Sequence, residues 1–296
     1  MKILLLGKNG QVGWELQRSL SMLGELTALD RSHMAGNLCN IEHVTSGIRA
    51  LRPDVIVNAA AYTAVDKAES EPDMARLINA EAPAHIAQTA SEIGSLFVHY
   101  STDYVFDGGG SIPWKETDPT GPLSVYGQTK LEGEQAIATS GCRHLIFRTS
   151  WVYGIRGANF ARTILRLLQE REVLTIINDQ FGVPTSAELI ADISALAIRD
   201  TCADNHLCGT YHLAPAGETT WWDYASYIAE AAQKIAPEYP WVTREIKPIF
   251  TKNYPTVAQR PLNSRLNADK LVTAFNLCKP DWKNGVERFL AEALTA

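Results

Sequence analysis

The chain has 296 residues, of which 46% are hydrophobic and 20% are charged, and its formal net charge at pH 7 is −6. This length suffices for one large domain, or two moderate ones, with a sizeable core. The negative balance argues against a general nucleic-acid binder, because such domains concentrate Lys and Arg on one surface. An anionic ligand must therefore be met by local groups.

The N-terminus and the cysteines are typical of a protein of a reducing compartment. The chain runs at once into a strand-like stretch, 2–6, without the apolar region of a signal peptide, and it has no stretch of 18 apolar residues. Its five cysteines show neither a Cys-x-x-Cys spacing nor a paired framework, which favours reduced thiols. We therefore expect a soluble cytoplasmic protein with no membrane or nucleic-acid partner.

A strand, a glycine-rich turn and a helix are predicted at the start of the chain. Residues 2–6 form a continuous apolar run, as in a strand buried on both faces of a parallel sheet. Gly7, Gly10 and Gly13 follow, and apolar residues then recur at helical spacing. Small residues let the backbone approach a pyrophosphate, and the N–H groups at a helix start hold its negative charge. This unit predicts a dinucleotide site.

The next predicted strand, 26–29, ends at an acid and a base that bear on the choice of cofactor. Asp30 lies some twenty residues beyond the glycines, where a carboxylate can accept both hydroxyls of the adenosine ribose, as in NADH. Arg31 follows directly, and a guanidinium at this place suits the 2′-phosphate of NADPH. The residues leave both cofactors open.

Strands and helices then alternate. Strands are predicted at 55–58, 96–100 and 145–147, with helices over 73–92 and from 126 through 137. The third strand leads into small residues that leave room for a ligand at the mouth of an open sheet, and the fourth leads to the hydroxyl of Thr102. His99, inside the fourth strand, is interpreted as a core histidine. The alternation predicts an α/β fold with a Rossmann-type doubly wound parallel sheet.

The alternation weakens after residue 148. Helices are predicted over 159–170 and 221–236 and from 285, and strands at 174–177, 209–213 and 242–249. Thr185 with Glu188 suits a capping box at the start of a further helix. We expect a dinucleotide-binding domain over 1–150 and a smaller mixed α/β substrate domain over 151–296, with some elements returning to the first.

Tyr126 and Lys130 lie four positions apart, about one turn along one face of the predicted helix. A phenol with a pKa near 10 donates a proton poorly at neutral pH, and lowering that pKa by about three units requires roughly 4 kcal/mol of preferential stabilisation of the phenolate. A Lys ammonium in a dry pocket supplies much of this. The pair alone recurs by chance on solvated helix faces, so its interpretation depends on the glycine turn and Thr102.

Taken together, these motifs resemble the extended short-chain dehydrogenase/reductase family. The resemblance runs over the full length and rests on Gly-x-x-Gly-x-x-Gly, Ser-Thr-Asp, Tyr-x-x-x-Lys and their separations. Finer motifs, such as Arg-Thr-Ser-Trp-Val-Tyr-Gly at 148–154 and Arg-Pro-Leu-Asn-Ser-Arg-Leu at 260–266, are similar to members that make dTDP-L-rhamnose, a precursor of bacterial surface polysaccharide. The resemblance implies reduction, by NADPH or NADH, of the C4 ketone of the dTDP-4-keto-6-deoxy sugar dTDP-4-dehydro-6-deoxy-L-mannose.

The resemblance also assigns residues to roles. It implies a catalytic set of Thr102, Tyr126 and Lys130, and a sugar contact at Trp151. With the turn glycines above, the positions that match cofactor contacts are Gly7, Gly10, Gln11, Val12, Gly13, Asp30, Arg31, Asn37, Leu38, Ala61, Tyr62 and Thr63, besides Tyr126 and Lys130. It further implies a homodimer. Some members of the subfamily hold Mg²⁺ at the dimer interface through glutamates, and Glu15, Glu188 and Glu292 match those positions. The alternative is a helix cap at Glu188 and helix-surface acids at the other two positions.

The substrate diphosphate needs cations, and Asp103 stands beside the catalytic hydroxyl. A guanidinium fork suits phosphate oxygens, which makes Arg260 and Arg265 the candidates for the diphosphate. Surface or interdomain salt bridges are the alternative for both. Asp103 is assigned to the substrate site, and the alternative is that it only fixes its loop.

Three other readings compete. The 4,6-dehydratases of the family carry Thr-Asp-Glu where this chain has Thr102, Asp103 and Tyr104, and a tyrosine cannot replace that glutamate as a base at neutral pH. A non-catalytic nucleotide-binding subunit, such as the regulatory subunit of methionine adenosyltransferase, needs no proton donor, so the retained catalytic set disfavours it. Another nucleotide-sugar ketoreductase or an epimerase stays open.

Overall fold

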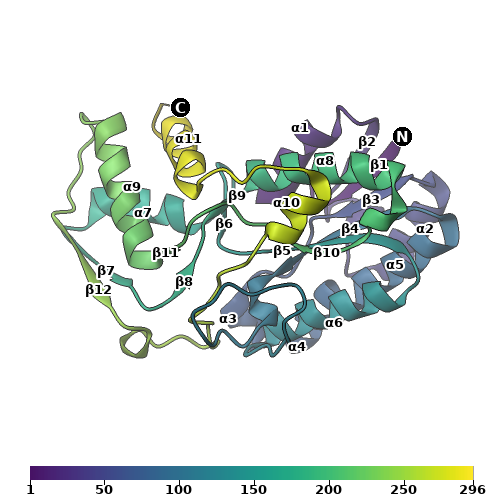
Figure 1. The fold of residues 1–296 in the computed structure, drawn as a ribbon, viewed down its shortest axis with the longest axis horizontal. Helices are drawn as coiled ribbons and strands as arrows, with labels where there is room; N and C mark the ends of the chain where they lie inside the picture. The colour runs from purple at the N-terminus through teal and green to yellow at the C-terminus, as the bar shows by residue number, and fades with distance from the viewer. Residues whose placement is uncertain (296) are drawn as a thin grey trace.

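The computed structural model describes residues 1–295 and has a six-stranded parallel sheet at its centre (Figure 1). Its strands, in sheet order, are β10 (Gly209–His212), β5 (Arg143–Thr149), β4 (Leu96–Thr102), β3 (Val55–Asn58), β1 (Lys2–Leu6) and β2 (Glu25–Leu29). The strand order reverses between β1 and β3, and a doubly wound sheet binds its ligands at such a switch point. The predicted doubly wound sheet is confirmed.

Helices cover both faces of this sheet, because its strands are apolar on both sides. Leu5 of β1 packs into one cluster and Leu4 into the other, and both side chains are buried. One face is covered by α1 (Gln11–Leu20), α8 (Ala187–Ala203) and α10 (Asp269–Phe275), and the other by α2 (Ile41–Leu51), α5 (Ala82–Ile93) and α6 (Val125–Thr139) (Figure 1). Two apolar layers therefore hold the carboxyl ends of the strands in place.

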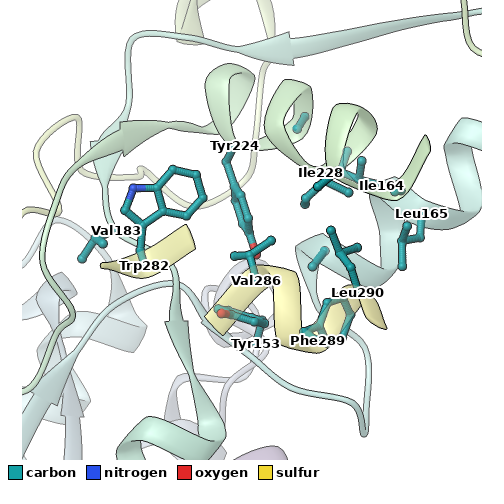
Figure 2. Packing of buried hydrophobic residues seen from close by; sticks show 14 of the residues in the cluster. Tyr153, Ile164, Leu165, Val183, Tyr224, Ile228, Trp282, Val286, Phe289 and Leu290 are labelled. Carbon is teal, nitrogen blue, oxygen red and sulfur yellow. The ribbon is translucent and has the colours of Figure 1, made fainter. Parts of the chain in front are cut away.

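A second core lies beside the sheet and is formed mainly by the later part of the chain. It is built by α7 (Phe160–Glu170), α9 (Trp221–Ile235) and α11 (Trp282–Thr295), next to the parallel pair β7 (Val173–Ile177) and β12 (Glu245–Ile249). Figure 2 shows Tyr224 of α9 among α7 and α11 residues, with the ring of Trp282 edge-on at 5.6 Å. β10 is a strand of the six-stranded sheet, and α8 and α10 pack on one of its faces. The chain after residue 150 therefore contributes to both cores.

Short strands and helices complete the fold. The short strands are β6 (Val152–Tyr153), β8 (Phe181–Gly182), β9 (Thr185–Ser186) and β11 (Thr219–Thr220), and the short helices are α3 (Val65–Ala68), α4 (Pro72–Arg76), η1 (Met34–Gly36), η3 (Asp103–Val105), η4 (Asn205–Leu207) and η5 (Thr251–Asn253). Among residues 1–295, no helix combines the length and the apolar character needed to cross a membrane.

The structure differs from the sequence-based expectations at the helix predicted over 73–92 and at the predicted capping box. The helix predicted over 73–92 is α4 and α5 joined by a π-helical turn, η2 (Leu77–Glu81). The capping box predicted at Thr185 is wrong, because Ser186 caps α8 by accepting from the N–H of Leu189 at 3.2 Å, while Thr185 pairs with Val152 in a short ladder.

Candidate active site

The turn between β1 and α1 is built for close approach. Gly7 has φ +88°, and a Cβ there would lie 2.6 Å from the backbone nitrogen of Ala60. A Cβ on Gly13 would lie 2.1 Å from the carbonyl oxygen of Gly7. The N-cap of α1 is Gly10, and no side chain caps the helix start. The open helix N-terminus fits the pyrophosphate of a dinucleotide, as the sequence predicted.

Asp30, at the end of β2, is held as a carboxylate by its neighbours. It accepts from the N–H of Ser32 at 2.8 Å and from Asn9 Nδ2 at 2.6 Å. Hydrogen bonds from the Ser32 hydroxyl and then from the Ser32 N–H hold the pKa of Asp30 below the usual range. Arg31 beside it is exposed. An acceptor for ribose hydroxyls and a cation for a 2′-phosphate thus lie together, and the residues fit either nicotinamide cofactor.

The remaining predicted cofactor residues surround the same switch point. They lie at the start of α1 (Gln11, Val12), after η1 (Asn37, Leu38) and after β3 (Ala61, Tyr62, Thr63). The loop after β3 is held by Asn79 of the π-helical turn. This residue was not among the predicted site residues.

Asn79 connects the cofactor loop to the catalytic helix. Its Oδ1 accepts from Tyr62 N at 2.8 Å, and its Nδ2 donates to Tyr62 O at 3.0 Å and to Thr129 Oγ1 at 3.2 Å. The side chain is fully buried. An Asn inside a predicted helix was the available signal, since Asn is a poor interior helix former and π-helical turns often mark functional sites.

The structure brings Thr102 and Tyr126 together as predicted. Thr102 ends β4, and Tyr126 lies in the first turn of α6, which Ser124 caps by accepting from Gly127 N at 3.2 Å. A Cβ on Gly127 would lie 2.3 Å from the carbonyl oxygen of Tyr104, so the missing side chain lets α6 approach the loop after β4. The ring of Tyr104 meets that of Tyr126 edge-on at 5.5 Å.

The structure does not show the expected lowering of the Tyr126 pKa. Burial raises the pKa of this phenol to about 12, and a hydrogen bond with Thr102 only partly opposes the shift. The reason is the direction of Lys130, whose Nζ donates to the carbonyl of Tyr100 at 2.6 Å and lies 3.1 Å from His99 Nε2. Burial also lowers the pKa of Lys130 to about 8.

His99 is buried, as expected of a core histidine, but it also contacts Lys130, which is predicted to be catalytic. Its Nδ1 lies 3.2 Å from Asn58 Nδ2, so a line of polar groups runs from the end of β3 to α6. The sequence alone could not predict the contact between His99 and Lys130, because it depends on how α6 packs against β4.

Asp103 lies beside the catalytic hydroxyl and is buried. Its Oδ1 accepts from Thr102 Oγ1 at 3.1 Å. Burial raises the pKa of Asp103 to about 6, and the Ser264 and Thr102 hydroxyls only partly oppose this rise. The charge of Asp103 in turn raises the pKa of Tyr126. This carboxyl group therefore influences the proposed proton donor without being a strong base.

Trp151 follows β5 in an uncommon backbone conformation. Its φ is +48°, and its indole stacks on that of Trp221 with ring centroids 3.6 Å apart. A Cβ on Gly182 would lie 2.6 Å from the Trp151 ring, so the glycine makes room for it. A bulky residue in the left-handed region is strained and persists where the surroundings fix it.

The two candidate phosphate ligands have different surroundings. Arg260 Nη2 pairs with Asp66 of α3 at 2.8 Å, and the Arg260 charge opposes the rise that burial causes in the pKa of Tyr104. Arg260 therefore lies near Tyr104, whose ring in turn meets that of Tyr126. Arg265 is 9% exposed, pairs with Glu218 at 2.8 Å and lies 4.2 Å from the Phe181 ring centre.

The three predicted magnesium ligands, Glu15, Glu188 and Glu292, line one small hollow. Burial and then the charge of Glu188 raise the pKa of Glu15, while Glu188 itself pairs with Arg288 at 2.9 Å. Among the described residues, no group of three His, Cys, Asp or Glu is placed to hold a metal ion. One chain does not form the site, and a metal shared across a homodimer interface stays a prediction.

The fold and the site define a class. A parallel sheet with a glycine-lined turn at its switch point, followed by a Thr, Tyr and Lys set, is the arrangement of a short-chain dehydrogenase/reductase. Residues 1–295 match the model of the RmlD substrate binding domain family, and the chain belongs to this family.

Named relatives agree with this assignment. The chain is 54% identical over 297 aligned positions to the dTDP-4-dehydrorhamnose reductase of Escherichia coli (strain K12), covering 100% of this chain and 99% of the relative. It resembles the solved dTDP-4-dehydrorhamnose reductase of Clostridium acetobutylicum, with a TM-score of 0.89, 32% identity and full coverage of both chains. The enzyme from Bacillus anthracis, solved in complex with NADP, gives a TM-score of 0.88 at 32% identity, covering 99% of this chain and 100% of that one.

Proposed function

We propose that the chain is an NAD(P)H-dependent reductase of the C4 ketone of dTDP-4-dehydro-6-deoxy-L-mannose, giving dTDP-L-rhamnose. The observation that carries the proposal is the junction of Thr102 and Tyr126 at the carboxyl end of β4, beside a turn that fits a dinucleotide. Full-length relatives named for this reaction support the choice of sugar.

The residues divide the work of reduction between them. A reduced nicotinamide, when bound, supplies the hydride. Tyr126 donates the proton to the oxygen at C4, and Thr102 hydrogen-bonds the same oxygen as negative charge develops on it. Lys130, once charged, stabilises the phenolate that Tyr126 becomes. Trp151 offers an aromatic face to the sugar.

Two observations favour reduction over the alternatives. Tyr104 stands where an eliminating relative needs a carboxylate, and burial raises its pKa further above the usual value, so it cannot remove a C5 proton at neutral pH. A pure binding subunit has no use for a buried proton donor next to a hydroxyl at the sheet mouth.

The test is turnover by the purified chain with dTDP-4-dehydro-6-deoxy-L-mannose and, separately, NADPH and NADH. We expect oxidation of at least one cofactor, with dTDP-L-rhamnose as the product. Absence of turnover with both cofactors, by a folded chain that binds them, would support the binding-subunit alternative instead.

Arg260 is proposed to bind the substrate diphosphate. Loss of a charge-assisted hydrogen bond costs about 1.5–3 kcal/mol, so Arg260→Ala should raise the KM for the nucleotide sugar by about 10- to 100-fold. Asp66→Asn is the matched control, because it breaks the same ion pair but keeps the guanidinium, and it should leave that KM no higher. An unchanged KM in Arg260→Ala would rule out this role.

A further inference from the structure

Two buried polar side chains lie directly behind Lys130 and have no part in the reaction described above. Asn58 ends β3, His99 lies in β4, and both are 1% exposed. Lys130 Nζ is 3.1 Å from His99 Nε2, and His99 Nδ1 is 3.2 Å from Asn58 Nδ2. With the N–H of Ala60 and the carbonyl of Tyr100, these groups form one continuous chain of hydrogen bonds.

The direction of this chain is fixed at the Ala60 end. Ala60 N donates to Asn58 Oδ1 at 3.1 Å, and a backbone N–H can only donate. The amide oxygen of Asn58 therefore faces Ala60, and its NH₂ group faces His99. Because that NH₂ group donates, His99 Nδ1 must accept, and a neutral imidazole then carries its proton on Nε2. Burial alone lowers the pKa of His99 well below its usual value, which favours a neutral ring.

The Nε2–H of His99 points at Lys130, so the lysine must supply a lone pair. An ammonium group has three donors and no acceptor, and it would set donor against donor at this buried contact. A neutral amine accepts from His99 and donates to the carbonyl of Tyr100 at 2.6 Å. Only the neutral amine satisfies every member of the chain, and buried networks are stable when fully satisfied.

The charges around Lys130 do not overrule this arrangement. Burial lowers its pKa to about 8, and Glu134, one turn further along α6, opposes that shift. Glu134 is itself held by Arg148 of β5, through three hydrogen bonds of 2.6–3.1 Å. On the remaining sides, Tyr126 of α6 and His99 of β4 are uncharged at neutral pH.

We propose that Asn58 fixes the tautomer of His99, and that His99 through its Nε2–H favours the neutral amine of Lys130 over the ammonium. His99 and Asn58 are thus positioning residues. Whether Lys130 is charged depends on the hydrogen-bond partners that the site offers to its Nζ. The importance of the Lys130 charge for catalysis rests on the proposed function. The tautomer of His99 and the charge state of Lys130 do not rest on it.

The first test is nitrogen-15 NMR of the histidine-labelled chain without cofactor, which reports which ring nitrogen carries the proton. His212 is an internal reference, because its Nδ1 lies 3.0 Å from the carbonyl oxygen of Trp114, which can only accept. We expect opposite tautomers, with the proton on Nε2 in His99 and on Nδ1 in His212. A His99 signal with the proton on Nδ1 overturns the proposal.

The second test follows Lys130 by carbon-13 NMR of its Cε during a pH titration, with Lys130→Met to assign the signal. We expect a midpoint near the pKa of about 8, below the midpoints of exposed lysines. In Asn58→Asp, the new carboxylate accepts from His99 Nδ1, so the tautomer should reverse and the Lys130 midpoint should rise. A Lys130 signal that titrates with the surface lysines overturns the proposal.

The wild-type spectra decide the matter even if Asn58→Asp does not fold. A chain with the expected tautomers but no ketone reduction would overturn the proposed function alone. A chain that turns over with the other tautomer of His99 would overturn this inference alone.

Discussion

Replacement of Tyr126 by phenylalanine is expected to lower kcat/KM for ketone reduction by about 10²- to 10⁴-fold, the usual contribution of a positioned general acid. The change removes one oxygen and keeps the ring that packs edge-on against Tyr104. Cofactor affinity, measured by fluorescence titration, should therefore stay close to that of the unchanged chain. Steady-state kinetics with the nucleotide sugar measures the loss.

A matched control is Tyr211→Phe, which also removes a buried phenolic oxygen. Tyr211 donates to the carbonyl of Leu207 at 2.9 Å, at the edge of the sheet formed by β10. It should lose about 1 kcal/mol of stability with little change in kcat. Full activity in Tyr126→Phe would remove this residue from the mechanism.

The largest expected effect on stability comes from the buried ion pair under the catalytic helix. Glu134 of α6 and Arg148 of β5 are only 5% and 7% exposed, and their closest contact is 2.6 Å. Glu134→Ala leaves a guanidinium buried without its partner, which typically costs 3–5 kcal/mol, so we expect a loss of about that size in the free energy of unfolding. Urea denaturation, analysed for midpoint and slope, measures it.

An exposed pair on α7 provides the comparison. Arg166 and Glu170 also meet at 2.6 Å, but their side chains are 60% and 47% exposed. Glu170→Ala should cost at most about 0.5 kcal/mol, because solvent screens such pairs. Replacing both buried partners with apolar residues, Glu134→Leu with Arg148→Met, should cost less than Glu134→Ala. Equal losses in Glu134→Ala and Glu170→Ala would contradict the assignment of a buried pair.

Most of the sheet was predictable, because its strands are short apolar runs between glycine-rich and polar turns. The helix α2 was not predicted, although Val44, Ile48 and Leu51 recur at helical spacing after Asn40, whose side chain accepts from His43 N and caps the helix. Apolar spacing and capping residues could not predict the π-helical turn. It depends on the close approach of α6 at Gly133, where a Cβ would lie 2.2 Å from the carbonyl oxygen of Asn79.

The residue types of the site were predictable, but their environment was not. The spacing of Tyr126 and Lys130 placed both on one helix, yet the burial that raises one pKa and lowers the other depends on β4 and β5. His99 was interpreted as core because it lies inside a predicted strand, and the strand pattern does not report which side chain of another element lies opposite it. The domain boundary near residue 150 and the homodimer stay predictions.

Transfer of deuterium tests the central claim most directly. The chain is incubated with dTDP-4-dehydro-6-deoxy-L-mannose and reduced cofactor that carries deuterium at the transferring position of the nicotinamide. A ketone reductase with Tyr126 as proton donor should place one deuterium at C4 of dTDP-L-rhamnose, while the proton on the new hydroxyl comes from solvent. A product without deuterium, or with deuterium at any other ring carbon, would contradict the proposed reaction.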